Sequence, residues 1–196
     1  MFNLGGDESS SPKKPAAKNE TSFMAADPGI PDVEFAENFT QSGGKFLFCE
    51  DVEMAIKNLQ NIGAETGLSK VYSPDANLRS LVARAGFRDF AEKCTDAELF
   101  CTTCEYLVAY NGGIMVDARH TKGNKLKDLP DVFVILAFTD QLVSRLSDAL
   151  KGIQMRYSGK EMPSEITTLH GPNKSGLKDP GSTTATKEIY LLYVER

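Results

Sequence analysis

From residue 45 onward, short runs of consecutive apolar residues alternate with longer segments in which apolar residues recur every three or four positions. A continuous apolar run predicts a strand buried on both faces, whereas the longer spacing predicts an amphipathic helix. This alternation predicts an α/β fold of three α/β/α layers, with a mainly parallel sheet. The predicted strands are 45–49, 71–72, 131–138 and 188–194, and the predicted helices are 52–62, 74–85 and 140–153.

Residues that favour helix ends support these boundaries. Asp51, Ser73 and Thr139 stand at the predicted helix starts, where a side-chain oxygen can accept a hydrogen bond from the first turn. Gly63 and Gly86 follow the last apolar positions of two helices, and glycine readily adopts the left-handed conformation that ends a helix.

The strongest turn signal in the chain lies between two short apolar runs, 106–109 and 114–116. Asn-Gly and Gly-Gly pairs accept the positive φ that a tight hairpin needs, so we predict a β-hairpin inserted between the two halves of the sheet. Adjacent glycines also leave backbone N–H groups that a ligand can approach, although a hairpin needs such residues with or without a ligand. The residues of this turn, predicted to bind a ligand, are Tyr110, Asn111, Gly112 and Gly113.

Two polar loops follow predicted elements. The loop 117–130 carries five cationic or potentially cationic side chains against two acids, and the segment 170–184 is rich in glycine and hydroxyl groups. Ligands of parallel sheets bind at the carboxyl ends of strands, where the strand order reverses. We therefore predict that the hairpin and both loops form one pocket for an anionic small molecule. The loop residues predicted to bind it are Arg119, His120, Gly171, Pro172, Asn173, Lys174 and Ser175.

Glu105 and His170 are the candidate acid–base pair of this pocket. An acid at a strand edge that faces solvent is the alternative interpretation of Glu105, and an ordinary surface histidine that of His170. The pair Cys101-x-x-Cys104 lacks the four ligands of a zinc or iron–sulfur site. We therefore expect buried free thiols in a reducing compartment, with no metal ion and no cofactor bound by the chain itself.

Composition narrows the range of partners. Of the 196 residues, 41% are hydrophobic and 25% charged, and the net charge of −5 argues against nucleic acid as the main partner. The longest apolar run, 132–138, is too short to span a bilayer, and the N-terminus has no charged segment followed by an apolar one. A cytoplasmic protein without membrane insertion is expected.

The first 30 residues are rich in Gly, Ser, Pro, Lys and Ala. Such a polar, nearly neutral segment buries too little apolar surface to order itself, so residues 1–30 are predicted to be a disordered tail. Residues 31–196 are predicted to be a single α/β domain. Its first element is a short helix at 31–40, with Val33, Phe35 and Phe39 in contact with the domain.

The order of motifs from about residue 45 to the C-terminus resembles the LUD domain, the lactate-utilisation family. The resemblance is carried by Ala109-Tyr110-Asn111-Gly112-Gly113, then Leu129-Pro130-Asp131-Val132, the helix from Asp140, Gly171-Pro172-Asn173-Lys174-Ser175, and the last strand. It implies a fold similar to sugar-phosphate isomerases and CoA transferases. It also implies a role in the oxidation of lactate to pyruvate, beside iron–sulfur proteins and other LUD subunits.

Several positions depart from the family pattern, among them Asn111 for the hairpin threonine and Gly176-Leu177 where an aspartate is expected. Tyr110 stands near the position of the family's hairpin acid, and a phenol cannot form the acyl anhydride of a CoA transferase. Lys174 stands in place of an arginine. This difference keeps the positive charge but loses the bidentate hydrogen bonding of a guanidinium group. The leading hypothesis is therefore an accessory subunit of lactate or organic-acid utilisation that binds an anionic small molecule. The alternatives are a stand-alone enzyme on the same fold and a non-catalytic assembly module.

Overall fold

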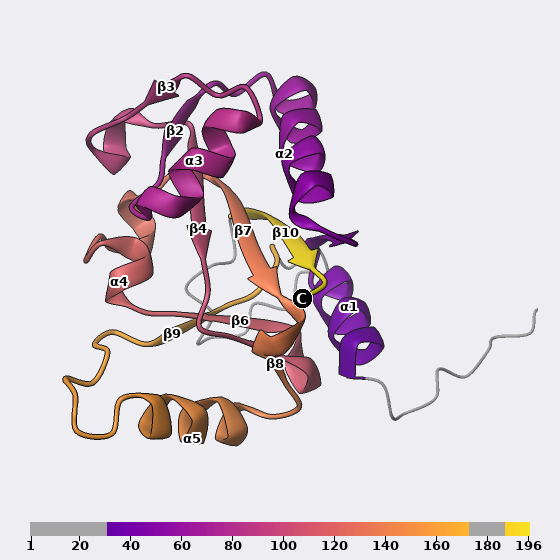
Figure 1. Cartoon of the computed structure of the whole chain (residues 1–196), viewed down its shortest axis with the longest axis vertical. Helices are drawn as coiled ribbons and strands as arrows, with labels where there is room; N and C mark the ends of the chain where they lie inside the picture. The colour runs from indigo at the N-terminus through magenta and orange to yellow at the C-terminus, as the bar shows by residue number, and fades with distance from the viewer. Residues whose placement is uncertain (1–30, 173–186) are drawn as a thin grey trace, which may run out of the picture.

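A six-stranded sheet, parallel throughout, forms the centre of the protein (Figure 1). The computed structural model describes residues 31–172 and 187–196. The long strands carry continuous apolar runs because both faces of the sheet are covered. In the order β1-β10-β7-β4-β2-β3, the strands are Lys45–Cys49, Glu188–Val194, Val132–Phe138, Leu99–Thr103, Lys70–Tyr72 and Asp89–Phe90. The predicted α/β class with a mainly parallel sheet is confirmed.

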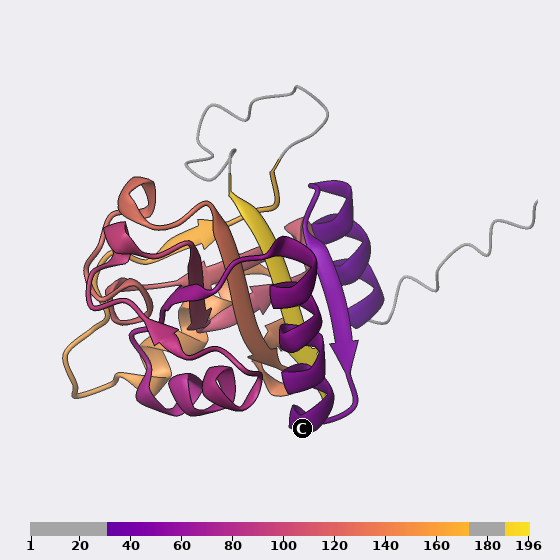
Figure 2. The same ribbon diagram turned by 90° about the horizontal axis from the view of Figure 1, so that it is seen from above.

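Helices α2 (Val52–Thr66) and α3 (Ala76–Arg84) pack on one face of this sheet. The other face is covered by α1 (Pro31–Gln41) and by a second sheet, which the sequence did not predict. Figure 2 shows α1 and α2 on opposite sides of β1. The second sheet has the order β8-β5-β6-β9, with strands Leu142–Val143, Tyr106–Val108, Gly113–Val116 and Thr167–Leu169.

The remaining elements connect these layers. Helix α5 (Leu146–Arg156) packs on the outer face of the second sheet, and the one-turn helix α4 (Ala118–Thr121) follows β6. Among the described residues, no helix has both the length and the apolar character needed to cross a membrane. Four short 3-10 helices, η1 to η4, span Cys94–Asp96, Ala109–Asn111, Leu126–Asp128 and Thr139–Gln141.

The structure confirms some of the predicted helix boundaries and corrects others. Asp51 caps α2 by accepting a hydrogen bond from the Met54 N–H (2.7 Å). The helix does not end at Gly63, however, but continues to Gly67, which has a φ of 70°. Gly63 lies where α2 contacts the loop after α3, since a Cβ there would stand 2.7 Å from the ring of Phe87 in that loop. A packing requirement therefore explains the glycine that resembled a helix end.

Helix α3 is capped by Asp75 rather than by Ser73. One Asp75 carboxylate oxygen accepts from the N–H groups of Asn77 (2.7 Å) and Leu78 (3.0 Å). Ser73 is buried, and its hydroxyl has no hydrogen-bond partner in the described part of the chain. The predicted cap was therefore two residues early, because the chain stays extended beyond the end of β2 before it turns into the helix.

The predicted helix 140–153 begins later than expected. Thr139 starts a 3-10 turn rather than capping an α-helix, and Leu142 and Val143 form β8, which pairs with β5. Only then does α5 begin, and its Leu146 is largely exposed. The apolar residues that resembled the first turn of a helical stripe serve the edge of a second sheet, and local spacing alone does not reveal that sheet.

The N-terminal helix α1 is confirmed, with one difference. Phe35 and Phe39 are fully buried, with ring centroids 5.6 Å apart, whereas Val33 points toward solvent. Strand β1 was predicted to be buried, but it is an edge strand, and its Phe48 side chain is half exposed. The predicted tail, residues 1–30, lies outside the described residues.

Candidate functional site

A cleft opens at the carboxyl ends of β2 and β4 and has a volume of about 230 Å³. After β2 the chain proceeds outward to β3, whereas after β4 it proceeds in the opposite direction, to β7. This is the point where strand order reverses, which is the usual ligand position in parallel α/β sheets. The lining residues are Pro74, Asp75, Thr102, Thr103, Glu105, Arg119 and His120.

Glu105 lies between β4 and β5 and is almost fully buried. Its N–H donates to the Met115 carbonyl (2.9 Å), which fixes the backbone against β6. Its carboxylate accepts from the Arg119 guanidinium, from Arg156 Nη1 (2.7 Å) and from the Tyr157 hydroxyl (3.3 Å). Glu105 is therefore not the solvent-facing edge acid of the alternative interpretation.

Asp117 follows β6 and caps α4. One carboxylate oxygen accepts from the Arg119 N–H (2.8 Å), and Arg119 Nε reaches both oxygens, at 3.2 and 3.1 Å. The side chain is fully buried, which by itself would raise its pKa. The Arg119 hydrogen bonds and the neighbouring His120 outweigh that effect and hold the pKa of Asp117 below its usual value, so the group stays an anion.

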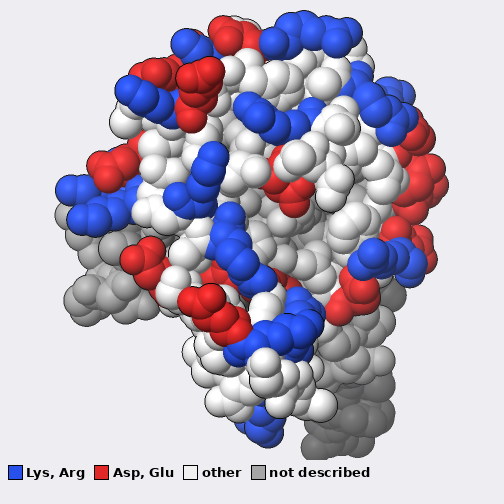
Figure 3. All heavy atoms as spheres, turned by 60° about the vertical axis from the view of Figure 1, so that its left-hand side comes forward, with Lys and Arg blue, Asp and Glu red and all other residues white. Residues whose placement is uncertain are grey.

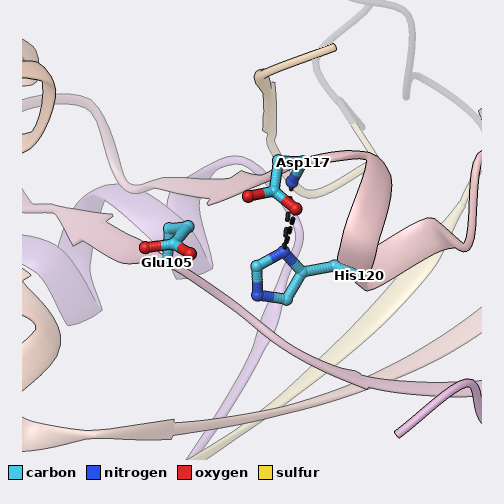
Figure 4. Close-up of side chains that lie close together, drawn as sticks. All are labelled: Glu105, Asp117 and His120. Atoms are coloured by element: carbon cyan, nitrogen blue, oxygen red, sulfur yellow. Dashed lines mark hydrogen bonds and ion pairs between the residues drawn. The ribbon is translucent and has the colours of Figure 1, made fainter. Parts of the chain in front are cut away.

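His120 is held from two sides. Its Nδ1 lies 2.9 Å from an Asp117 carboxylate oxygen, and its carbonyl accepts from the Thr102 hydroxyl (3.0 Å), which ties α4 to β4. Nδ1 also lies 3.2 Å from the Asp117 N–H. The contact with the buried anion is shorter and charge-assisted, so we place the ring proton on Nδ1. Nε2 then carries the lone pair, and Figure 4 shows it pointing away from Asp117.

The charges of the site are layered. The carboxylates of Glu105 and Asp117 are 6% and 0% exposed, whereas the side chains of Arg119 and Arg156 are 50% and 49% exposed. The Arg119 guanidinium stacks over the Tyr157 ring at 4.7 Å, which adds a cation–π contact. The hydrogen bonds that Arg119 donates to the Asp117 carboxylate raise the pKa of Arg119 further. The network therefore presents cations to solvent over buried anions.

Basic side chains also mark this side of the molecule. Figure 3 shows Lys and Arg side chains along the middle of the face that carries α4, with Asp and Glu side chains beside them. The chain as a whole has a net charge of −5, so the cations here are a local feature of an acidic protein.

Glu105, Asp117 and His120 each offer a possible metal-ligand atom, and these atoms lie within 4.8 Å of one another. Both carboxylates already accept hydrogen bonds from guanidinium groups, and a metal ion would have to displace them. The donor set as arranged therefore fits an ion-paired network better than a cation site.

The sequence matches the pattern that defines the LUD domain over residues 33–184, more than three quarters of the chain. The chain belongs to the LUD-domain family. A curated relative, lactate utilization protein C of Halalkalibacterium halodurans, is 27% identical over 85 residues, which are 43% of this chain and 37% of that protein. The match thus spans little more than a third of that relative's length.

A solved structure shares the fold. The crystal structure of a DUF162 family protein from Deinococcus radiodurans superposes with a TM-score of 0.57 and 16% identity, covering 85% of this chain and 96% of that one. The family match over residues 33–184 agrees with the family that the motif order implied, and the solved structure agrees with the fold.

In this LUD protein the predicted hairpin forms, but its glycines face inward. The N–H groups of Gly112 and Gly113 donate to the Ala109 carbonyl (3.3 Å) and to Asn111 Oδ1 (3.1 Å). A Cβ on Gly112 would stand 2.4 Å from the backbone nitrogen of Phe39 in α1. The prediction that these amides are open to a ligand is therefore wrong, because the turn packs on a helix. Tyr110, at its tip, points largely to solvent.

The predicted partners Glu105 and His170 lie at opposite ends of β6. The pairing register places His170 beside Gly113, and Glu105 beside Val116. These two positions of β6 are three residues apart, which is about 10 Å along the strand. Glu105 and His170 therefore do not form a hydrogen-bonded acid–base pair. The second predicted loop is described only at its start, where the Gly171 N–H donates to Ser42 Oγ (3.1 Å) and Pro172 is half-buried. Asn173, Lys174 and Ser175 lie outside the described residues.

The structure thus brings together three of the predicted residues: Glu105, Arg119 and His120. It adds Asp117, whose spacing from His120 at the start of a helix was a usable signal for a capping pair. Arg156 and Tyr157 could not have been found from the sequence. They stand about 50 residues from Glu105 and reach it only because α5 packs on the second sheet.

Proposed function

We propose that this LUD protein serves the utilisation of lactate or a related organic acid, and that it binds a small carboxylate in the cleft at the ends of β2 and β4. The observation that carries the proposal is the charge layering at Arg119. Its guanidinium neutralises buried acids on one side, and half of its side chain remains accessible on the other. Membership of the LUD family and the name of the curated relative support lactate as the first ligand to test.

The cleft suits a small anion in size as well. Its volume, about 230 Å³, is below that of typical drug-sized pockets and compatible with a molecule of a few heavy atoms. Thr102 and Thr103 line the cleft at the end of β4. Asp75 is the one acid of the lining outside the buried network, and it caps α3 through one oxygen.

Oxidation of a 2-hydroxy acid releases two electrons, so a protein with this role would act beside a partner that accepts them. We propose that the partner is an iron–sulfur protein of the same system, as the family resemblance implies. Co-purification of the full chain with its genomic neighbours tests this part. Oxidation of lactate by the isolated chain with an added two-electron acceptor dye, and without any protein partner, would favour the stand-alone enzyme.

The binding proposal is tested by titrating L-lactate, D-lactate, pyruvate and phosphate into the full chain and measuring melting temperature and heat. Thr103→Glu places a negative charge in the cleft, and Thr103→Gln is the size-matched neutral control. We expect wild type to bind a carboxylate and the glutamate variant to bind at least tenfold more weakly than the glutamine variant, because like charges repel at short range.

The predicted loop site provides a second comparison. His170→Ala with Lys174→Ala removes the two candidate cationic groups of the second predicted loop. The cleft proposal expects this double variant to bind as wild type does. Loss of binding in the double variant, with equal binding by the two Thr103 variants, would move the site to the loop.

A further inference from the structure

We propose that His120 is a specificity-determining residue of this cleft: its Nε2 accepts a hydrogen bond from the hydroxyl group of a 2-hydroxy carboxylate, and Asp117 positions the ring for that contact. The inference rests on the proposed function and names its substrate class. It separates 2-hydroxy acids from simple carboxylic acids and from 2-oxo acids, neither of which offers a hydroxyl donor at that carbon.

The first observation is that the ring is fixed. Asp117 is fully buried and its carboxylate lies 2.9 Å from His120 Nδ1, while the Thr102 hydroxyl holds the His120 carbonyl. The imidazole itself is 11% exposed. The ring therefore has little freedom to rotate, and the direction of Nε2 is set by the fold rather than by a ligand.

The second observation is which acceptor remains. Glu105 is engaged by Arg119, Arg156 and Tyr157, and Asp117 by Arg119 and His120. Within the described part of the chain, His120 Nε2 has no hydrogen-bond partner, and it points away from Asp117 (Figure 4). His120 Nε2 is not among the buried unpartnered atoms of the described residues, so it is accessible to a ligand that donates a hydrogen bond to it.

The third observation is what stands beside it. Arg119 and His120 are consecutive on α4 and both line the cleft. A guanidinium offers only donors and suits a carboxylate, whereas a neutral imidazole with its proton on Nδ1 offers an acceptor at Nε2 and suits a hydroxyl group. In a 2-hydroxy acid the carboxylate and the hydroxyl group occupy adjacent carbons. One donor site and one acceptor site on neighbouring residues match that pattern.

The other charged groups that face the ring do not change this assignment. Glu105 is paired with two guanidinium groups, and Asp75 lines the cleft as the cap of α3. Both disfavour a second anionic group on the ligand, so a monocarboxylate fits better than a dicarboxylate. This preference for a monocarboxylate is checked by a competition experiment, in which malate should displace lactate only weakly.

The test compares L-lactate, D-lactate, pyruvate and propionate by calorimetry with the full chain at pH 8. Propionate lacks only the hydroxyl group, and pyruvate carries a carbonyl oxygen that cannot donate. We expect one enantiomer of lactate to bind wild type about tenfold more tightly than propionate or pyruvate, the usual effect of one hydrogen bond. His120→Phe keeps a ring of similar shape and should reduce that ratio to about one.

A measurement on the wild type guards against variants that fail to fold. Nitrogen-15 NMR of the imidazole rings reports which nitrogen carries the proton, and a His170→Ala sample assigns the two signals. We expect the Nδ1-protonated form for His120, a change of that form in Asp117→Asn, and a shift of the Nε2 resonance with lactate but not with propionate. This tautomer signal would not change if Asp117 served stability alone.

The possible outcomes separate the two claims. Equal binding of lactate and propionate, or an Nε2-protonated His120, would overturn the inference and leave the binding proposal standing. No binding of any carboxylate would overturn both. A lactate preference that persists in His120→Phe would assign the hydroxyl contact to another residue.

Discussion

Replacement of Gly112 by alanine tests the packing of the hairpin on α1. Gly112 has a φ of 60°, and a Cβ there would stand 2.4 Å from the Phe39 nitrogen and 2.6 Å from the Asn38 carbonyl carbon. Both atoms belong to the backbone of a helix, so neither can move aside as a flexible side chain would. The variant must displace the turn or the helix.

The cost has two parts. The left-handed conformation costs alanine about 1 kcal/mol more than glycine, and overpacking at a rigid contact costs about 1–3 kcal/mol more. We expect Gly112→Ala to lower the free energy of unfolding by about 3 kcal/mol in urea denaturation. Gly67→Ala is the matched control, since Gly67 has a φ of 70° and a Cβ there would meet nothing within 4 Å. It should lose only about 1 kcal/mol.

The comparison of these two variants decides the role of the glycine. Equal losses in Gly112→Ala and Gly67→Ala would show that the turn does not press on α1, and the account of the hairpin as a packed support would be wrong. A loss in Gly112→Ala that reverses on addition of a carboxylate would return the turn to the ligand site.

Three further predictions concern the charged network and the thiols. Glu105→Gln removes the buried anion that pairs with Arg156 and one of the two that pair with Arg119, and we expect a loss of about 2 kcal/mol in urea, against less than about 0.5 kcal/mol for Glu53→Gln, whose ion pair with an arginine is exposed. The folded-state pKa of Asp117 is lowered, so its stabilisation is complete above the ordinary carboxyl range and is lost as pH falls through the folded value; Asp117→Asn should flatten the stability profile below about pH 4. All four cysteines are buried and free, and burial raises the pKa of the Cys101 and Cys104 thiols. Ellman's reagent should therefore react slowly with the native protein and with four thiols in denaturant, and rapid labelling of the native state would contradict this.

Local signals predicted four of the six strands of the central sheet, β1, β2, β7 and β10, but neither β3 nor β4. Continuous apolar runs identified β7 and β10 because both faces of those strands are covered, and the Asp51 cap located the start of α2. The hairpin was found from its Asn-Gly-Gly turn. An apolar run, a helix cap and a tight turn are each determined by residues that are close together in the sequence, so each can be predicted from the sequence.

The second sheet could not be predicted in the same way. β8 has two residues and β9 three, and each is a strand only because it pairs with a hairpin strand distant in sequence. The same non-local pairing carries α5 to Glu105 and so brings Arg156 into the site. Sequence analysis therefore found Glu105, Arg119 and His120, and it missed Asp117, the lining at the ends of β2 and β4, and the residues at the end of α5.

Glycine gave the least reliable functional signal. Gly63 resembled a helix end and Gly112 a ligand-binding turn, and both prove to be positions where a ring or a helix leaves no space for a side chain. Composition alone does not distinguish a close approach of the backbone to a ligand from a close approach to another part of the same chain.

The central claim, that a small carboxylate binds at the carboxyl ends of β2 and β4, is tested most directly by titrating lactate into nitrogen-15-labelled protein and mapping the backbone amide shifts. The account predicts the largest shifts at Asp75, at Thr102 and Thr103, and along α4. Largest shifts at Gly112 and Gly113, with little change along α4, would contradict it.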